Sequence, residues 1–292
     1  MKEFILKKGF ILLISILMIS CGGDSDNDTP NSQNNPEEPP KENVLVIPNS
    51  GYSTPVSYEG MNTVWSDEFN KTSLDLDFWT FQIGDGCPDI CGWGNEELEY
   101  YKSENTQIKD GYLVIEAKNE NAGNKNYTSS RITTQGKFSI KYGRVDVRAV
   151  MPKGQGIWPA IWMLGESLNT VGWPACGEID IMEMIGGENR ENTVYGTAHW
   201  DNYGGNANYG GEYSLSNFDF SQEFHVFSII WDEEFIRWYV DDIQYHEIDI
   251  TPDGLSEFKE EFHFLINLAV GGNWPGNPTS STVFPQFFVI DY

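Results

Sequence analysis

Positively charged residues are scarce in this sequence. Its 292 residues include 18 Lys and Arg against 44 Asp and Glu, a formal net charge of −26. A protein that binds a nucleic-acid backbone needs clustered Lys and Arg, so this composition argues strongly against nucleic acid as a partner. Anionic polysaccharides and lipid surfaces fit poorly for the same reason. A neutral ligand is compatible with the charge.

Cysteine is also rare, and helical periodicity is nearly absent. Four Cys are too few to form a disulfide scaffold, and a chain of this length buries an ample core without cross-links or metals. Aromatic residues make up 14%, which excludes disorder over the whole length because disordered chains contain few of them. These absences leave a globular protein built mainly from strands, which we expect to be a monomer.

The N-terminus has the order of residues typical of an export signal. Lys residues within the first eight positions precede an apolar run over residues 9–19 that is too short to span a bilayer. The run ends close to Cys21, which has small residues on both sides and resembles the lipidated Cys of a bacterial lipoprotein. We therefore expect residues 1–20 to be a lipoprotein signal peptide and Cys21 to carry the lipid anchor. An ordinary signal peptide with an incidental Cys is the alternative.

The next segment is polar and rich in Pro and Asn, with little to bury. We expect residues 21–58 to form a flexible tether and residues 59–292 to form the folded domain. The early acidic residues resemble the surface-export signal of lipoproteins in the Bacteroidetes. This resemblance implies the outer membrane or cell surface of a Gram-negative bacterium.

The body of the chain consists of short alternating segments between Gly, Asn, Asp and Pro clusters. Their regular spacing predicts an all-β fold, an antiparallel β-sandwich or jelly roll with a concave substrate-binding sheet. Asp241 and Asp242 predict the turn of a hairpin. The clearest strand segments are residues 112–117, 143–151, 227–231, 236–242 and 262–270.

The segment GEIDIMEMIG (residues 177–186) carries three acids whose spacing does not fit a regular strand. Glu178 and Asp180 share one face, but Glu183 lies at an odd offset and points to the other. Met184 is out of phase with the apolar residues Ile179 and Ile181 in the same way. One β-bulge around Met182 corrects both errors, turning the three acids outward and the three apolar residues toward the core.

The corrected spacing suits glycoside hydrolysis. Glu178 and Glu183 would lie roughly 13 Å apart at Cα, and their side chains could lean to the about 5–5.5 Å that retaining glycosidases use between carboxyls. We assign Glu178 as nucleophile and Glu183 as acid/base, with Asp180 orienting Glu178 and tuning its pKa. A solvated strand face and a calcium site are the alternatives.

The motif resembles the signature of glycoside hydrolase family 16 in its bulged form, and flanking blocks strengthen the resemblance to its laminarinase branch. The resemblance covers about residues 60–292. It implies a jelly roll that hydrolyses internal β-1,3-glucosidic bonds of a neutral β-glucan, with no cofactor for catalysis. The blocks are WSDEF, GWGNEELEYY, SSRITTQGKFSIKYGRVDVRAVMPKGQGIWPAIWMLG, GTAHW and INLAVGGNWPG.

Further side chains are candidates for sugar binding. Trp158 and Trp162 are four apart and share one strand face, where indole rings could stack on glucose rings; core packing is the alternative. Trp274 lies in a Gly-rich loop that could also plug one end of the sandwich. The resemblance implies cleft positions for Asn95, Arg131 and His199, whereas a lone His is otherwise a structural residue.

Two further features concern stability. Cys87 and Cys91 form a CxxxC pair, a poor zinc site, so we expect a disulfide in an exported protein. The resemblance implies a structural calcium ion on the convex side, bound by Glu68, the backbone of Gly111 and Asp291.

Two functional classes stay open. The first is a membrane-anchored endo-1,3-β-glucanase, with mixed-linkage β-1,3-1,4-glucan or a galactan as other substrates; sulfated galactans fit poorly with the negative charge. The second is a glucan-binding protein without activity on the same fold. The presence of both Glu178 and Glu183 favours the enzyme.

Overall fold

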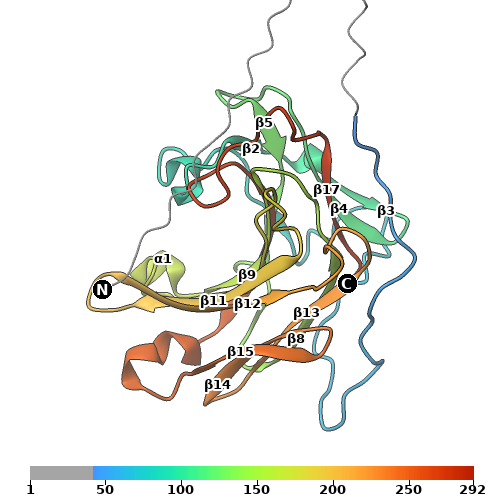
Figure 1. Cartoon of the computed structure of the whole chain (residues 1–292). Helices are drawn as coiled ribbons and strands as arrows, with labels where there is room; N and C mark the ends of the chain where they lie inside the picture. Colours follow the sequence, from blue (N-terminus) through green and yellow to red (C-terminus); the bar gives the residue numbers. More distant parts are fainter. Residues whose placement is uncertain (1–41) are drawn as a thin grey trace, which may run out of the picture. The chain divides into compact units, whose positions relative to one another are not determined.

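The computed structural model describes residues 42–292, which fold into two layered antiparallel sheets and a small third sheet (Figure 1). This confirms the all-β sandwich expected from the sequence. The signal peptide, Cys21 and the first part of the tether lie outside the described residues. Within residues 42–292, no helix is long and apolar enough to cross a bilayer.

The first sheet has eight strands and carries the cleft. Strand β7 (Ser139–Ile140) pairs with β16 at one side of the main path. The other strands follow in the spatial order β1 (Thr80–Phe81), β6 (Arg131–Thr133), β16 (Phe262–Val270), β9 (Ile157–Gly165), β10 (Glu178–Glu183), β11 (Thr193–Asp201) and β12 (Asn206–Ser214).

The second sheet has seven strands; part of it lies below the first sheet in the view of Figure 1, and the rest lies at the upper right. Its order is β15 (Ile243–Asp249), β14 (Phe235–Val240), β13 (His225–Trp231), β8 (Gly143–Val150), β17 (Gln286–Ile290), β4 (Tyr112–Ala117) and β3 (Thr106–Lys109). The expected hairpin joins β14 to β15, because Asp241 and Asp242 adopt φ of 50° and 63°, as a tight turn between twisted strands requires.

Short elements connect the sheets. Strands β2 (Glu99–Tyr101) and β5 (Tyr127–Ser129) form a parallel pair at the top of Figure 1. The only α-helix of the described residues is α1 (Leu168–Val171). Three 3₁₀ segments complete the elements: η1 (Cys91–Gly94), η2 (Ser103–Asn105) and η3 (Asp253–Lys259).

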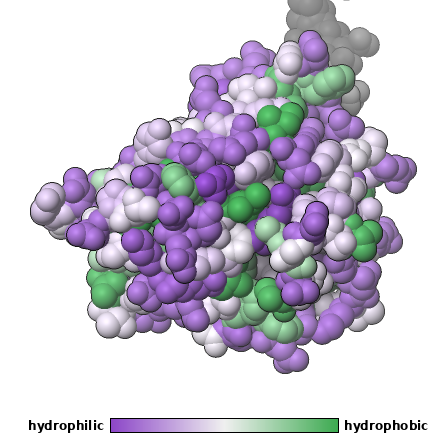
Figure 2. All heavy atoms as spheres, turned by 90° about the horizontal axis from the view of Figure 1, so that it is seen from below, coloured by the Kyte–Doolittle hydropathy of each residue, from purple (hydrophilic) through white to green (hydrophobic). Residues whose placement is uncertain are grey.

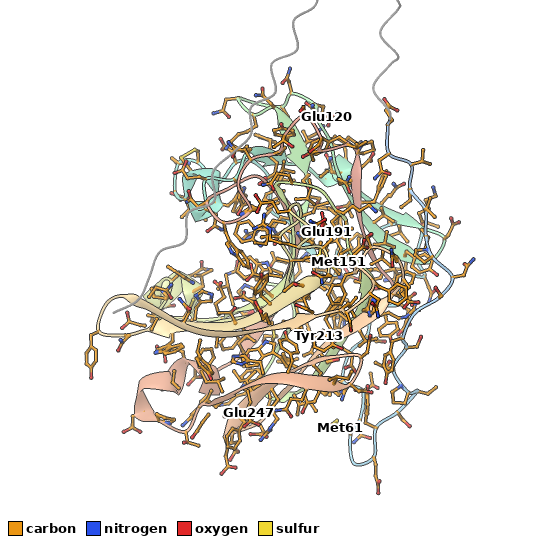
Figure 3. The ribbon with its side chains drawn as sticks, in the orientation of Figure 1. Met61, Glu120, Met151, Glu191, Tyr213 and Glu247 are labelled. Carbon is orange, nitrogen blue, oxygen red and sulfur yellow. A yellow bond between two sulfur atoms is a disulfide. The ribbon has the colours of Figure 1, made fainter. Side chains whose placement is uncertain are left out.

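The core lies between the two large sheets and is rich in aromatic residues. Figure 3 shows Met151 in this interior, where it is 2% exposed, and Met61 at the periphery, where it is 47% exposed. The face shown in Figure 2 is mostly hydrophilic, with small separate hydrophobic patches. Large side chains that are fully buried include Trp79, Trp231, Trp238, Phe227, Phe258, Phe262 and Phe288.

The described part of the expected tether lies against the sandwich. Leu45 and Ile47 pack on a small apolar cluster of the second sheet, and the Nε of Arg148 donates to the carbonyl of Tyr52 at 2.5 Å. Gly51 forms a parallel bridge with Phe224. Residues 45–52 therefore contact the folded domain, and the two apolar side chains gain burial against it.

Candidate active site

A cleft of about 420 Å³ opens over the eight-stranded sheet. All nine side chains predicted as catalytic or sugar-binding line it, contributed by four strands and two loops. They are Asn95, Arg131, Trp158, Trp162, Glu178, Asp180, Glu183, His199 and Trp274.

The strand that carries the acids is bulged where the sequence predicts. Along β9, Asp180 lies opposite Trp162 but Met182 lies opposite Ile161, so Ile181 is the extra residue. The register against β11 shifts between Asp180 and Glu183 as well. Because of this shift, all three acids face the cleft.

The apolar residues of β10 confirm the same register. Ile179, Ile181 and Met184 are 0%, 1% and 0% exposed, so all three face the core as expected. Met182 is buried as well, at 0%. The bulge therefore places two successive apolar side chains in the interior and lets Glu183 return to the cleft face.

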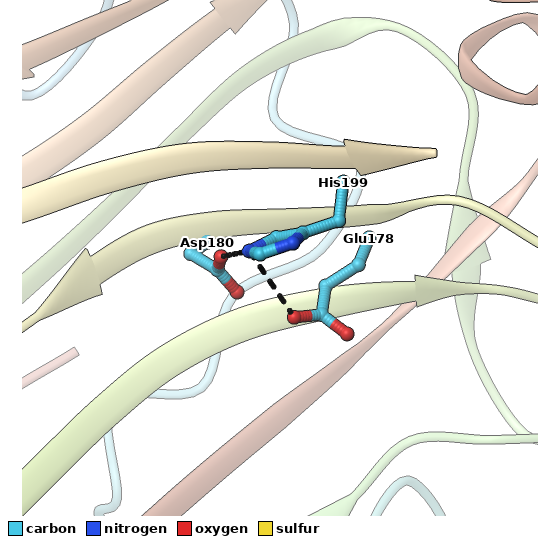
Figure 4. A group of neighbouring side chains, drawn as sticks. All are labelled: Glu178, Asp180 and His199. Atoms are coloured by element: carbon cyan, nitrogen blue, oxygen red, sulfur yellow. Dashed lines mark ion pairs between the residues drawn. The ribbon is translucent and has the colours of Figure 1, made fainter. Parts of the chain in front are cut away.

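Glu178 and Asp180 meet His199, which comes from the neighbouring strand β11 (Figure 4). The Nε2 of His199 lies 3.2 Å from Oδ2 of Asp180 and 3.9 Å from Oε1 of Glu178. The indole N–H of Trp173 donates to Oε2 of Glu178 at 2.9 Å. Glu178 is thus held from two sides, while its side chain stays 17% exposed.

Glu183 is held by an indole of the cleft wall. The Nε1 of Trp158 donates to Oε1 of Glu183 at 3.0 Å. Trp158 is only 9% exposed, and its ring meets that of Trp274 edge to face at 5.5 Å. Trp158 therefore orients an acid, and little of its surface is open to the cleft. Trp274, 40% exposed, and Trp162, half-buried, keep more of their rings open.

The three carboxyls perturb one another in a desolvated site. Burial raises the pKa of Glu178 to about 8, and the nearby Asp180 adds to this rise. Burial also raises the pKa of Asp180 to about 7, against a hydrogen bond with Glu178 that lowers it. The pKa of Glu183 is raised well above its usual range by burial first, and then by Asp180 and Glu178. Three interacting carboxyls lose their protons in separate steps. A carboxylic acid and a carboxylate can therefore coexist in the cleft.

A hydrogen-bond network supports the cleft from beneath. Trp162 donates through Nε1 to Oδ1 of Asn267 at 2.7 Å, and the Nδ2 of Asn267 donates to the hydroxyl of Tyr101 at 3.1 Å. Glu97 accepts from that hydroxyl at 2.8 Å and from Nδ2 of Asn95 at 3.1 Å. This network fixes the Asn95 amide at the edge of the cleft.

Arg131 is fixed by its neighbours in the same region. Its guanidinium lies between the rings of Trp93 and Trp162, at 4.5 and 4.8 Å from their centroids. Its Nε donates to Oε1 of Gln82 at 2.5 Å. Stacking between two aromatic rings restricts the guanidinium, so it reaches the cleft in one orientation.

Several lining residues were not predicted from the sequence. Asn206 and Asn208 alternate on β12, a period-2 pattern that could have placed both on the cleft face. Asn267 is a polar residue inside an otherwise apolar strand, which is a usable signal too. Trp173 comes from an irregular loop and gives no such signal. The residues missed are Glu97, Ala160, Trp173, Thr197, Asn206, Asn208 and Asn267.

The remaining predicted residues lie away from the cleft. Cys87 and Cys91 form a disulfide in the structure. The Oδ2 of Asp291 accepts a hydrogen bond from Arg148 at 2.6 Å, so this carboxylate is already paired with a cation. Glu68 is exposed and Gly111 is half-buried. These contacts do not assemble a calcium site, and the ion stays a prediction.

A sandwich whose cleft holds three carboxyls with raised pKa values between aromatic and amide side chains is the framework of a glycoside hydrolase. The family model described as Glycosyl hydrolases family 16 matches residues 94–286. The chain belongs to this family.

Known proteins resemble the chain over most of its length. It is 37% identical over 268 residues to Glucan endo-1,3-beta-glucosidase A1 of Niallia circulans, covering 83% of this chain and 39% of that protein. It is 39% identical over 245 residues to the Beta-glucanase of Rhodothermus marinus, covering 78% of this chain and 82% of that protein. The chain thus spans about two fifths of the first relative and most of the second.

A solved structure shows the same fold. The laminarinase catalytic domain of Thermotoga maritima is 50% identical and superposes with a TM-score of 0.74. The match covers 79% of this chain and 95% of that one.

Proposed function

We propose that this chain is an exported, lipid-anchored endo-1,3-β-glucanase that hydrolyses internal bonds of laminarin-type glucans with retention of configuration. The observation that carries the proposal is the bulge in β10, which brings Glu178, Asp180 and Glu183 to one cleft. The names of the relatives from Niallia and Thermotoga support β-1,3-glucan as the substrate.

In the first step, a carboxylate oxygen of Glu178 forms a bond with the anomeric carbon. The bond from that carbon to the leaving oxygen breaks, and Glu183 gives its proton to this oxygen. In the second step, Glu183 takes a proton from water, whose oxygen attacks the anomeric carbon and releases Glu178. Two inversions give net retention, and Glu183 ends with the proton it began with.

The contacts around each carboxyl suit these roles. The N–H of Trp173 and the imidazole of His199 both favour the carboxylate of Glu178. The N–H of Trp158 occupies Oε1 of Glu183, so Oε2 is the oxygen left to carry the proton. Asp180 raises the pKa of both Glu residues, which keeps the acid protonated once a neighbouring carboxyl has ionised.

The walls of the cleft suit a neutral sugar chain. Trp162 and Trp274 offer aromatic rings, and amides of Asn95, Asn206 and Asn208 offer donors and acceptors for hydroxyl groups. The net charge of −26 disfavours sulfated polymers.

Digestion of three polysaccharides tests the proposal. Purified protein is incubated with laminarin, lichenan and agarose, and the product sizes are followed with time. We expect laminarin chains to shorten rapidly into a mixture of oligosaccharides, as internal cleavage requires. Faster cleavage of lichenan would indicate a mixed-linkage glucanase. Tight binding of laminarin with no cleavage of any polymer would indicate a glucan-binding protein.

The remaining parts of the proposal concern location and assembly. We expect Cys21→Ala in the full chain to move the protein from the membrane fraction to the soluble fraction. We expect the purified domain to be a monomer by light scattering. A calcium chelator should lower Tm and leave kcat near its starting value if the structural ion exists.

A further inference from the structure

We propose that Glu178, Asp180 and His199 form a binding site for Zn²⁺, and that zinc inhibits the enzyme by occupying the nucleophile. Across residues 42–292, these are the side chains of the His, Cys, Asp and Glu types that group closely enough to hold an ion. Their ligand atoms all lie within 4.8 Å of one another. Glu183 is outside the group, although it lines the same cleft.

The separations between ligand atoms suit a small tetrahedral ion. Zinc binds imidazole nitrogen and carboxylate oxygen at about 2.0–2.2 Å, which places two tetrahedral ligands about 3.4 Å apart. The Nε2 of His199 lies 3.2 Å from Oδ2 of Asp180 and 3.9 Å from Oε1 of Glu178. The Oε1 of Glu178 would have to move about 0.5 Å closer to Nε2 to reach the tetrahedral separation.

Asp180 supplies independent evidence for a ligand. Its side chain is 3% exposed, and no group among residues 42–292 makes a well-directed hydrogen bond to its Oδ2, whose polar neighbour is Nε2 of His199 at 3.2 Å. This oxygen points toward His199 in Figure 4. Buried polar atoms in folded proteins nearly always have a partner, so an unpartnered carboxylate oxygen beside an imidazole nitrogen is a place for a cation.

The next shell of contacts orients the imidazole for a metal. The Nδ1 of His199 lies 3.4 Å from Oδ1 of Asn206, an acceptor. In the tautomer that binds a metal, Nδ1 carries the proton and can donate it there, while the lone pair of Nε2 faces the two carboxyls. Ligating His residues are typically fixed by such a contact on their other nitrogen.

The composition of the site favours zinc over calcium or magnesium. Three protein ligands with one imidazole match a zinc site with one open position, whereas calcium takes six to eight oxygens. All three ligand side chains line the cleft. Because Glu178 must be free to attack the sugar, a bound ion excludes catalysis and competes with substrate. The inhibition rests on the proposed function, but the binding of zinc does not.

Calorimetric titration with zinc chloride tests the site in two variants that are matched to each other. Glu178→Gln and Glu183→Gln each remove one carboxylate from β10 and are both expected to abolish hydrolysis. Only Glu178→Gln removes a metal ligand. We expect the wild-type protein and Glu183→Gln to bind one zinc ion with similar Kd, and Glu178→Gln and His199→Asn to bind at least tenfold more weakly.

Two results would overturn the site. One is an equal loss of zinc affinity in Glu183→Gln and Glu178→Gln, with both variants folded by circular dichroism. The other is an absence of zinc binding by the wild-type protein at millimolar concentration. The absorption spectrum of bound Co²⁺ gives a second readout, because tetrahedral coordination produces intense visible bands that six-coordinate cobalt lacks. None of these measurements needs glucanase activity, so their failure is distinct from a failure of the proposed function.

Discussion

The indole N–H of Trp238 donates a hydrogen bond of 2.8 Å to the main-chain carbonyl of Asp180. Trp238 belongs to β14 in the second sheet, and Asp180 is the residue at which the bulge in β10 begins. Gly196, which lies in the neighbouring strand β11, leaves room for this indole. A Cβ at position 196 would lie only 2.4 Å from Cδ1 of Trp238. A buried side chain of one sheet thus fixes the irregular backbone of the other.

Trp238→Phe removes this hydrogen bond and keeps most of the apolar volume. We expect unfolding free energy to fall by about 1–3 kcal/mol, because a buried carbonyl loses its partner. We also expect kcat to fall, because the bulge sets the position of Glu183. Trp231→Phe is the matched control: its N–H bonds to the carbonyl of Phe258, away from the acids. A similar loss of kcat in both variants would contradict the role given to Trp238.

Deletion of Met182 tests the bulge itself. The deletion removes one residue, so a regular strand would again place the three acids on one face and Met184 toward the core. We expect the shortened protein to fold and to keep measurable glucanase activity, with lower stability because a buried Met is lost. Met182→Ala is the control for the lost side chain alone. A folded deletion variant without activity would show that placing the three acids on one face of the strand is not enough to position them for catalysis.

Glu97 holds two polar side chains at the edge of the cleft. It is 2% exposed and accepts hydrogen bonds from Asn95 and Tyr101. Glu97→Gln replaces one acceptor oxygen with a donor, so one of these contacts fails. We expect KM for laminarin to rise by roughly tenfold, equivalent to about 1.4 kcal/mol, with kcat changed little.

Asp146→Asn is the control for this substitution. Asp146 also accepts two side-chain hydrogen bonds, from Arg144 and Ser228, but it lies in the second sheet and does not line the cleft. We expect it to change Tm and leave KM near the wild-type value. Equal rises of KM in Glu97→Gln and Asp146→Asn would contradict a specific role for Glu97.

The raised pKa of Glu183 predicts the alkaline side of the pH profile. Glu183 must be protonated to act as the acid, and burial holds its pKa well above the usual range. The value of kcat/KM for laminarin should therefore fall as pH rises through this raised pKa. An aryl glucoside with a good leaving group needs no proton in the first step. We expect Glu183→Ala to retain activity on such a substrate, with the alkaline decline gone; an unchanged decline would contradict the assignment.

The sequence was enough to predict the register of β10. The acids and the apolar residues each departed from strict alternation, and a single β-bulge corrected both departures. It could not distinguish stacking from orienting roles among the Trp residues. Trp158 and Trp162 share a face, yet only Trp158 bonds an acid, and that depends on the bulge across the strand pair. Trp173 reaches Glu178 from a loop whose path is set by packing rather than by local periodicity.

The contact of residues 45–52 with the domain could not be predicted from local periodicity. Leu45 and Ile47 gain their burial from strands more than sixty residues further along the chain. The apolar residues of this segment follow no clear period, so the sequence alone assigns no element to them.

Trapping of the covalent intermediate tests the central claim most directly. The protein is incubated with a 2-deoxy-2-fluoro laminaribiosyl fluoride, which slows the second step, and is then digested and mapped by mass spectrometry. The account predicts one glycosyl adduct, attached to Glu178. An adduct on Asp180 or Glu183, or hydrolysis of laminarin with inverted products and no adduct, would contradict it.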